Sequence, residues 1–369
     1  MCMATFHEAL KHKNRLSPVL LKRAEVMGVG VGYADPKKPT AGASVIVYTH
    51  QKIVPSGLNN LKSVASKLGS SVPVRFLSAD SFKAHVLKVP KPKMYKATSF
   101  QSRNRPVPGG VSIGRTNPSA TGTAGLIVIK NNQLYILSNN HVLIRDNSSA
   151  FSETVQPGPA DGGRSGTDRV GRAYQFVPLR PGEVNFQDSS IALPTSNNLL
   201  NPRYLRNASG DLITVPGHLL SYPVGLQVFK SGRTSGTVRG TVESNNVDVR
   251  VSYGGSLGTL LFRNQTVIVG TSGPVSLPGD SGSVWLRSSD RYAVALNFAG
   301  PADGSRSISN PIGVVMASYG VRTAIPAAGG TYKAGKIKGT APHGDASYVQ
   351  PLTAQQRKRT RAILVKSHK

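Results

Sequence analysis

The sequence of 369 residues contains a single cysteine, Cys2, so no disulfide bond can form within the chain. Aromatic residues make up only 6% of it, whereas glycine (39) and proline (25) are abundant. This balance favours many short strands and turns over long helices. No run approaches the roughly 20 apolar residues of a membrane span, and residues 1–15 hold no apolar stretch suited to a signal peptide. These absences predict a cytoplasmic protein without a membrane span.

Acidic residues are scarce as well, 17 against 45 basic ones, which gives a net charge of +28. Residues 1–104 carry 17 basic and 4 acidic residues and residues 331–369 carry 9 and 1, against 19 and 12 in residues 105–330. This excess suits an anionic partner, namely nucleic acid, an anionic membrane surface or an acidic protein. A general basic background without a dedicated ligand is the alternative. Aromatic residues are not interleaved with the basic runs, so recognition by base stacking is not supported.

The sequence predicts neither a metal nor a cofactor. No cluster of Cys, His and Asp residues has the spacing of metal ligands. Residues 28–32 (Gly-Val-Gly-Val-Gly) lack the G-x-G-x-x-G spacing and the following helix of a dinucleotide-binding loop. We interpret them as a strand that another backbone approaches closely.

The composition divides the chain into four parts. The apolar pattern of residues 1–88 predicts a small α/β module. Residues 89–107, rich in proline and lysine, predict an extended linker. The basic residue type switches here from mostly lysine to mostly arginine, which supports a domain boundary. Residues 108–330 form a β-rich segment, and residues 331–369 predict a mobile or peripheral basic tail.

The module is expected to begin with helical residues within 5–25, interrupted at Pro18. Residues 58–68 read as a short amphipathic helix, and strands are expected at residues 26–33, 43–48 and 72–77.

The β-rich segment shows short apolar runs separated by Gly/Pro turns and only weak helical periodicity. Residues 125–130 and 134–138 are expected to pair as a hairpin with the tight turn Asn131-Asn132. Regular spacing of such strands indicates a barrel or a sandwich. Further strands are expected at residues 227–230, 236–243, 247–252, 266–269, 284–286 and 292–298.

The most informative motif is Gly-Asp-Ser-Gly-Ser at residues 279–283. A serine between glycines on a tight turn can present its hydroxyl group, and the N–H groups of that turn can converge on one point. Acyl transfer needs this geometry, a nucleophile beside an oxyanion hole. Ser281 is therefore the candidate nucleophile.

A serine nucleophile needs a base, and the base needs an orienting partner. His141, within Leu-Ser-Asn-Asn-His-Val-Leu at residues 137–143, closes a hydrophobic hairpin and is the candidate base. Asp188, within Gln-Asp-Ser-Ser-Ile-Ala-Leu at residues 187–193, precedes the start of an apolar strand and is the candidate orienting acid. Taken alone, a strand-end histidine and a turn or cap aspartate are more often structural. Together with Ser281, in the order His, Asp, Ser within one β-rich segment, they point to a triad.

At these residues the sequence resembles the chymotrypsin-like (trypsin-fold) serine proteases. It is most similar to their cysteine-poor intracellular branch of bacteria and plants, which includes the narrow-leaf type. The resemblance spans roughly residues 110–300, and residues 26–48 look like the small module that often precedes such domains. The matching stretches are residues 137–143, 156–158, 161–163, 188–193, 230–236 and 279–283.

The resemblance implies a mainly β fold, a double antiparallel β-barrel, preceded by the small α/β module. It implies a serine endopeptidase acting on protein or peptide substrates through an acyl-enzyme. Ser281 would be the nucleophile, His141 the general base and acid, and Asp188 its partner. The N–H groups of Gly279 and Ser281 would form the oxyanion hole. The edge that pairs with the substrate backbone would consist of Leu296, Asn297, Phe298, Ala299 and Gly300.

The chain departs from the extracellular members of that family in having no activation site whose new N-terminus would pair with the aspartate before the nucleophile. Asp280 is therefore expected to find another partner, such as Arg233, or to remain near solvent. Regulation by the N-terminal module, by a partner or by oligomeric assembly is then an open hypothesis. A catalytically idle scaffold that binds nucleic acid or another anionic partner is the alternative function.

Overall fold

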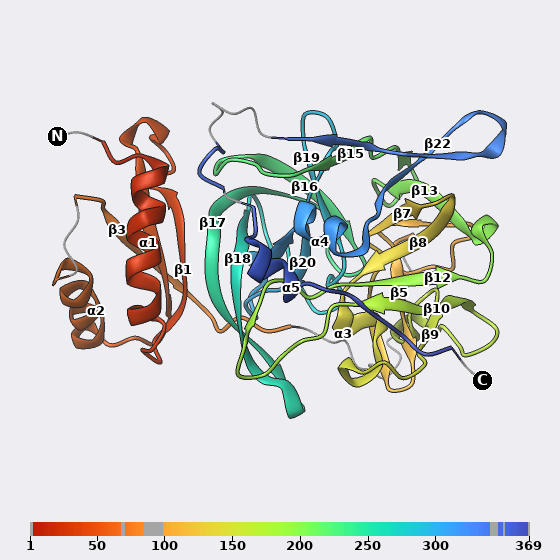
Figure 1. The fold of residues 1–369 in the computed structure, drawn as a ribbon, viewed down its shortest axis with the longest axis horizontal. Helices are drawn as coiled ribbons and strands as arrows, with labels where there is room; N and C mark the ends of the chain where they lie inside the picture. The colour runs from red at the N-terminus through yellow and green to blue at the C-terminus, as the bar shows by residue number, and fades with distance from the viewer. Residues whose placement is uncertain (1–2, 68–70, 85–98, 340–345, 350, 368–369) are drawn as a thin grey trace.

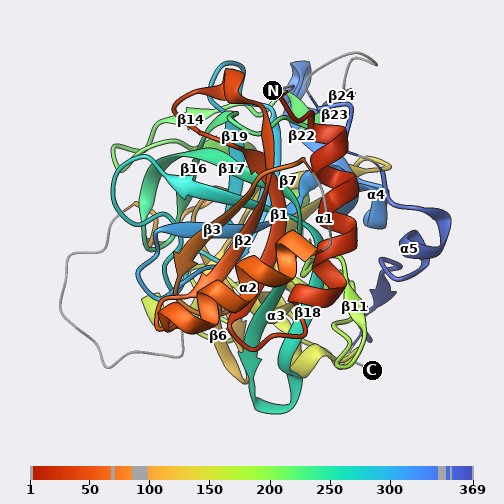
Figure 2. The ribbon, with the colours of Figure 1, turned by 90° about the vertical axis from the view of Figure 1, so that its left-hand side faces the viewer.

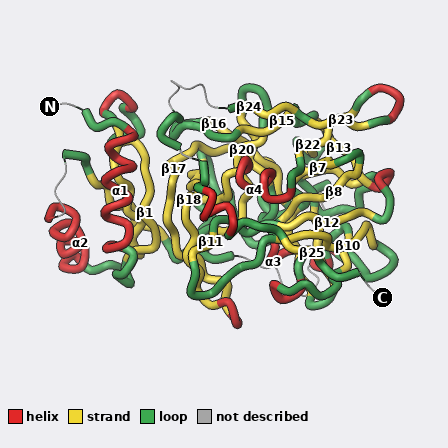
Figure 3. Tube along the Cα trace, viewed as in Figure 1, coloured by secondary structure: helices red, strands yellow, loops and turns green. Residues whose placement is uncertain are grey.

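The computed structural model describes residues 3–67, 71–84, 99–339, 346–349 and 351–367. Most of the predicted linker 89–107 lies outside these ranges. The described chain is mainly β, and its two large sheets are consistent with a double β-barrel preceded by a small α/β module. Figure 1 shows the module at one end of the molecule, and Figure 3 shows how strands dominate the remainder.

The N-terminal module is built on three strands covered by two helices. Both helices lie on the face of these strands that points away from the barrels (Figures 1 and 2). Thr5 caps the first helix, because its hydroxyl accepts from the Glu8 N–H at 3.2 Å while Glu8 accepts the Thr5 N–H. The predicted interruption at Pro18 is wrong: the proline lies in the last turn, where few intrahelical bonds remain to be lost. The elements are α1 (Phe6–Leu20), β1 (Val26–Tyr33), β2 (Ala43–His50), α2 (Pro55–Lys67) and β3 (Val74–Ala79).

The module does not form a sheet of its own. Strand β1 pairs antiparallel with β17 (Gly236–Gly254), so β1, β2 and β3 extend the larger sheet of the second barrel. The glycines of β1 permit this contact. A Cβ atom on Gly30 would lie 2.7 Å from a Val247 methyl, and one on Gly32 would lie 2.7 Å from the Glu243 carbonyl oxygen. The prediction of a strand closely approached by another backbone is confirmed.

The larger sheet has the order β11-β18-β21-β20-β19-β16-β17-β1-β2-β3; β15 pairs with β20, and β24 pairs with β15. The two strands predicted at 236–243 and 247–252 are one long strand, β17, whose register shifts between Val242 and Val249. Each bulge adds a residue and so breaks the alternation of side chains along the strand, which is why the sequence pattern indicated two strands. The remaining bounds are β11 (Val184–Asn185), β15 (Gly217–Leu219), β16 (Gln227–Gly232), β18 (Gly258–Gly270), β19 (Val284–Arg287), β20 (Ala293–Ala299), β21 (Arg306–Pro311) and β24 (Lys336–Lys338).

The second large sheet has the order β23-β22-β7-β8-β12-β10-β9-β5-β6, with β25 paired to β10. The predicted hairpin is confirmed as β7 and β8, and its turn residues Asn131 and Asn132 have positive φ values of 48° and 60°. The bounds are β5 (Ser112–Thr116), β6 (Ser119–Thr123), β7 (Leu126–Lys130), β8 (Gln133–Ser138), β9 (Glu153–Val155), β10 (Arg169–Phe176), β12 (Ser190–Pro194), β22 (Arg322–Pro326), β23 (Tyr332–Ala334) and β25 (Ile363–Leu364). A small third sheet contains β4 (Val107–Gly109), β13 (Leu200–Leu205) and β14 (Leu212–Ile213).

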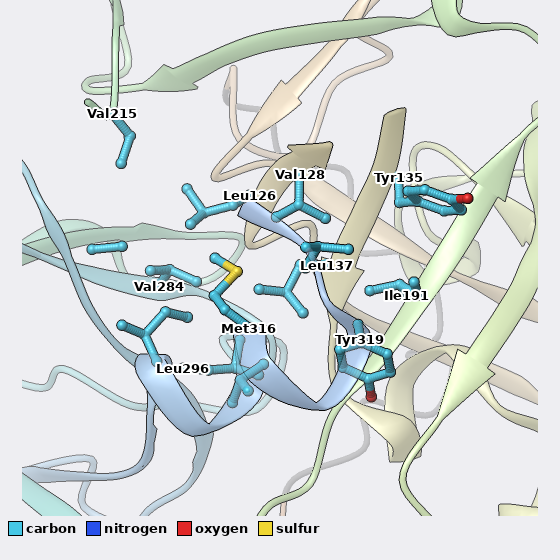
Figure 4. Close-up of a cluster of buried hydrophobic side chains, with 14 of the residues drawn as sticks. Leu126, Val128, Tyr135, Leu137, Ile191, Val215, Val284, Leu296, Met316 and Tyr319 are labelled. Carbon is cyan, nitrogen blue, oxygen red and sulfur yellow. The ribbon is translucent and has the colours of Figure 1, made fainter. Parts of the chain in front are cut away.

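A core of apolar side chains joins the two large sheets. Leu126, Leu137 and Ile191 come from one sheet, and Val284 and Leu296 from the other. Helix α4 (Ile312–Tyr319) adds its own side chains to this cluster (Figure 4). Burial of this apolar surface fixes the position of one sheet against the other.

The described part of the C-terminal region is not a peripheral tail. Strands β23, β24 and β25 belong to the sheets, and Val365 is buried against the Phe176 side chain. Tyr348 is buried and stacks on Phe6 with ring centroids 4.7 Å apart. Helix α5 (Ala354–Lys358) begins at the capping residue Thr353. None of the helices in the described ranges is long and apolar enough to cross a membrane.

A buried ion pair fastens the module to β17. Lys13 Nζ lies 2.8 Å from Asp248 Oδ1, and the Ser17 hydroxyl donates to Asp248 Oδ2 at 2.6 Å. Burial lowers the pKa of Lys13, while the charge of Asp248 opposes that change.

We predict that Asp248→Asn lowers the free energy of unfolding by about 3 kcal/mol, because it leaves the Lys13 ammonium buried without its counter-charge. Urea denaturation measures the change. The double variant Lys13→Met/Asp248→Asn should lose less stability than the single one, since no uncompensated charge remains. Equal losses in the two variants would contradict the role of the ion pair.

Candidate active site

His141 lies in α3 (Asn140–Leu143), a single helical turn that follows β8. Arg115, on β5, holds this turn in place: its Nη1 donates to the His141 carbonyl oxygen at 2.6 Å and to that of Val142 at 2.9 Å. Burial lowers the pKa of Arg115 to about 10, so the guanidinium stays charged at neutral pH. The backbone of the candidate base is therefore anchored by a buried cation that the sequence analysis missed.

Asp188 and His141 are in direct contact. Nδ1 of His141 lies 2.5 Å from Oδ2 of the fully buried Asp188 carboxylate. The other oxygen, Oδ1, accepts the Asn140 N–H at 2.7 Å. An ionised carboxylate only accepts, so Nδ1 carries the proton of this bond and the neutral ring keeps its lone pair on Nε2. That Nε2 atom is buried and has no hydrogen-bond partner in the described part of the chain.

Side-chain amides hold the backbone of Asp188. Asn139 Nδ2 donates to the Asp188 carbonyl oxygen at 2.7 Å. Asn310, on β21, accepts the Asp188 N–H at 3.1 Å and donates to the same carbonyl oxygen at 3.1 Å. Asn310 comes from the other large sheet, so the carboxylate is fixed at the junction of the two sheets.

Tyr253 is a third partner of this pair, which the sequence analysis did not single out. It lies near the end of β17, and its hydroxyl donates to Asp188 Oδ2 at 2.6 Å. Its ring stands edge-on to the His141 imidazole, with centroids 5.8 Å apart and planes at 80°. Burial, with the charge of Asp188 second, raises the pKa of Tyr253 well above its usual value, so the phenol remains a donor.

Ser281 lies on a turn whose backbone conformation requires glycine at two positions, 279 and 282. Gly279 has φ +100° and Gly282 has φ +95°. A Cβ atom would lie 2.4 Å from the Thr234 hydroxyl at Gly279 and 2.2 Å from the Thr123 carbonyl oxygen at Gly282. Within the described residues, the N–H groups of Gly279 and Ser281 donate to no other group. The turn thus carries two unused backbone donors beside the serine, and their role as an oxyanion hole stays a prediction.

Asp280 has a different partner from the one predicted. Its carboxylate is fully buried, and Oδ2 lies 3.7 Å from the equally buried Lys230 Nζ. The N–H groups of Thr234 and Ser235 donate to Oδ1 at 3.0 Å, and that of Leu277 donates to Oδ2 at 3.0 Å. Burial lowers the pKa of Lys230, against the effect of Asp280.

The expectation that Arg233 neutralises Asp280 is wrong, as is the alternative of a carboxylate near solvent. The Arg233 guanidinium pairs instead with Asp161, with Nε 2.8 Å from Oδ2.

Ser281 lies beside the turn of His141, but its hydroxyl points elsewhere in this structure. A Cβ atom on Gly122 would lie 2.6 Å from the Val142 side chain and 2.7 Å from the Ser281 carbonyl oxygen, so both segments pack against β6 at one residue. Ser281 Oγ donates to the Phe298 carbonyl oxygen at 3.4 Å, a long hydrogen bond. The structure thus brings His141 and Asp188 into contact, and it packs Ser281 and the residue after His141 against the same glycine, Gly122.

The residues of the predicted substrate edge, 296–300, differ in whether their backbone groups are already paired. Leu296 pairs with Val284 on one side and Asn310 on the other, so its backbone is inside the sheet. The Asn297 N–H and carbonyl are taken by Ser283 and Gly282. These two positions do not offer an open edge. The Phe298 carbonyl oxygen accepts from the Ser281 hydroxyl, and Ala299 is buried. The N–H and carbonyl groups of Gly300 pair with those of Lys83.

No family model and no curated protein matches the chain. Among solved structures it is similar to a glutamic acid-specific serine protease, with 20% identity and a TM-score of 0.42 over 59% of this chain and 100% of that one. It is also similar to protease A of Thermobifida fusca (21% identity, TM-score 0.42, 58% and 97% covered). A third similar structure is the chymotrypsin of Cellulomonas bogoriensis (22% identity, TM-score 0.42, 59% and 97% covered). These neighbours are chymotrypsin-like serine proteases.

No group of three or more His, Cys, Asp and Glu side chains within the described ranges could hold a metal ion.

The environment of Asp280 gives a testable prediction. Lys230→Met should lower the free energy of unfolding by about 3 kcal/mol, because the buried Asp280 carboxylate loses its counter-charge. Guanidinium denaturation measures this loss. Arg233→Met removes a cation that pairs with Asp161 and serves as the comparison; it should cost less, because the side chains of that pair keep 11% and 7% of their surface exposed, whereas those of Lys230 and Asp280 keep none. A larger loss for Arg233→Met than for Lys230→Met would contradict the assignment.

Proposed function

We propose that the protein is a serine endopeptidase that uses Ser281, His141 and Asp188. The support is the imidazole of His141: Asp188 holds Nδ1, while Nε2 is buried without a hydrogen-bond partner among the described residues. Val142, the next residue, and the Ser281 carbonyl both pack at Gly122, so the two turns are neighbours. A buried polar atom without a partner costs roughly 1–3 kcal/mol and calls for an explanation. A base that waits for the proton of a nucleophile supplies one.

In the proposed reaction, Ser281 Oγ leaves its long bond to the Phe298 carbonyl and donates its proton to His141 Nε2 while it attacks the carbonyl carbon of a peptide. The oxyanion that forms accepts from the N–H groups of Gly279 and Ser281. The imidazolium then protonates the leaving amine as the C–N bond breaks. A water molecule, deprotonated by the same imidazole, hydrolyses the acyl-enzyme. Every group in this sequence except water comes from the chain, so no cofactor is needed.

The substrate would bind by strand addition along residues 298–300. The Gly300 N–H and carbonyl pair with Lys83 in the structure, so a substrate strand would have to displace that segment. A protein or peptide in extended conformation fits this edge. Leu296 and Asn297 would support the edge from within the sheet and would not contact the substrate backbone.

Labelling of Ser281 tests this function directly. A fluorescent fluorophosphonate should label the purified wild-type protein, because it needs only the nucleophile, the base and the oxyanion donors. Ser281→Ala should abolish labelling, and His141→Ala should slow it by about a thousandfold. Ser289→Ala changes an exposed serine and should label at the wild-type rate. Absence of labelling in the wild type, or labelling that survives Ser281→Ala, would contradict the proposal.

Tyr253 gives a sharper test of the same site, as a positioning residue. Tyr253→Phe removes the donor to Asp188, and a hydrogen bond to a charged group contributes about 1.5 kcal/mol, so we expect about tenfold slower fluorophosphonate labelling. The thermal midpoint should change little, because the ring remains. Tyr332→Phe, on β23, is the matched control and should keep the wild-type rate. A Tyr253→Phe rate equal to that of the wild type would show that the hydroxyl does not position the pair.

A further inference from the structure

A cavity of about 380 Å³ lies where three distant parts of the chain meet. Helix α1 contributes one part of its wall, the paired strands β17 and β18 contribute a second, and residues 351–356 of the C-terminal region contribute a third. Its volume is at the lower end of the range of ligand pockets, about 300–1,000 Å³. The cavity therefore exists only while the module, the barrel and the C-terminal region are packed together.

Two bulges shape the part of the wall that the strands contribute. The register of β17 and β18 shifts on both sides of the Val247–Gln265 pair. Each shift contains an asparagine that lines the cavity, Asn246 with φ +51° and Asn264 with φ +60°. Asparagine tolerates this left-handed conformation, which most residues avoid. Because bulges redirect side chains and are common beside functional sites, two of them at one cavity suit a wall that contacts a ligand.

Two buried donors at this wall have no acceptor. Asn246 Nδ2 and Arg263 Nε are both buried, and neither donates a hydrogen bond to any described residue. Arg263 Nε lies 3.8 Å from Asp248 Oδ2, which is beyond hydrogen-bond distance. Buried polar groups are nearly always hydrogen-bonded. Two such donors at one cavity therefore call for an acceptor that the described part of the chain does not supply.

The charges around the cavity do not balance. Lys13 and Arg263 are cations, whereas Asp248 is the one acid that lines the cavity among the described residues. Lys13 Nζ and the Ser17 hydroxyl already bind the Asp248 carboxylate, so the charge of Arg263 is in excess. The Arg263 side chain is 43% exposed, so a ligand can reach it from solvent. A ligand with a single negative charge would neutralise this excess.

Another part of the lining is apolar. Its side chains come from α1, from the segment after β11 and from the C-terminal region: Leu10, Pro18, Phe186, Pro351 and Leu352. Phe186 is 6% exposed and Leu352 is 7% exposed. An inorganic anion would leave these side chains without a contact, whereas the hydrocarbon part of an organic acid would cover them and gain the free energy of apolar burial.

We infer that the cavity is a binding site for a small aliphatic carboxylate. One carboxylate oxygen accepts from Asn246 Nδ2 and the other accepts from Arg263 Nε, while the hydrocarbon chain covers Phe186 and Leu352. The ligand contacts all three parts of the chain that meet here, so its binding stabilises the attachment of the module to the barrel. Ser281 takes no part in this binding, which is therefore independent of the proposed proteolytic function.

Calorimetric titration of the full-length protein with sodium hexanoate tests the inference. Hexanoate should bind saturably, with one molecule per chain, and more tightly than acetate, which is too short to cover the apolar side chains. Hexanamide has a similar shape but no charge, so it should bind about tenfold more weakly than hexanoate. The inference is overturned if hexanoate shows no saturable binding, if hexanamide binds equally well, or if inorganic phosphate binds more tightly.

Two variants locate the binding. Arg263→Met removes Nε and the excess charge, and Asn246→Gly removes the amide at a φ that glycine adopts readily. Each should bind hexanoate about tenfold more weakly. The matched controls are Arg164→Met, at an exposed arginine before β10, and Asn132→Gly, at the β7–β8 turn with φ +60°. Both controls should bind hexanoate as the wild type does.

The thermal midpoint without ligand shows whether each variant is folded. It should stay close to the wild-type value in Asn246→Gly, and this variant alone decides the matter if the midpoint of Arg263→Met falls. Wild-type affinity in the folded site variants would overturn the site. An equal loss of affinity in the controls would assign the binding to the net positive charge of the chain and would overturn it as well.

Discussion

The candidate site depends on a buried carboxylate, that of Asp280, beside the serine. A charge without exposure to water has to be compensated by the fold, and here Lys230 and the N–H groups of residues 234, 235 and 277 do so. Lys230 lies on β16, residues 234 and 235 lie in the turn that follows it, and Leu277 lies just before the Ser281 turn. The N–H groups of Gly279 and Ser281 have no acceptor among the described residues. The partner of Asp280 is thus internal, and no released N-terminus is needed to complete it.

Strand β17 connects the parts of the molecule that bear on function. Along its length it pairs with β1 of the N-terminal module, binds the segment at Lys83 through Ser252, and presents Tyr253 to Asp188. The module pairs with residues 244–249 of β17, and Tyr253 lies a few residues further along the same strand. β17 therefore connects the module to the Asp188–His141 pair. Removal of the module would uncover an edge of β17 close to the residue that orients His141.

Local signals in the sequence were enough for the hairpin at Asn131-Asn132 and for the glycine turn around Ser281, and they singled out His141 and Asp188, which lie in contact. The catalytic roles of these residues stay a prediction. Each of these local signals depends on neighbouring residues or on a short motif. Lys230, Tyr253 and Arg115 were missed because their roles arise from pairing between residues far apart in the chain: Tyr253 lies 65 residues from Asp188. The Arg233 assignment failed for the same reason, since Asp161 lies closer to it in space than Asp280 does. The bulges of β17 interrupt the regular alternation of its residues, so the sequence pattern of this one long strand was interpreted as two short strands.

A strand edge that binds substrates presents a conflict. It must expose unpaired N–H and C=O groups to accept a peptide, yet such groups are a liability for association with other chains. At Gly300 this chain covers the edge with its own residues 82–84, and at β17 it covers the neighbouring edge with β1. The backbone pairing that completes the sheet on both sides of β17 therefore also protects its edges from association with other chains.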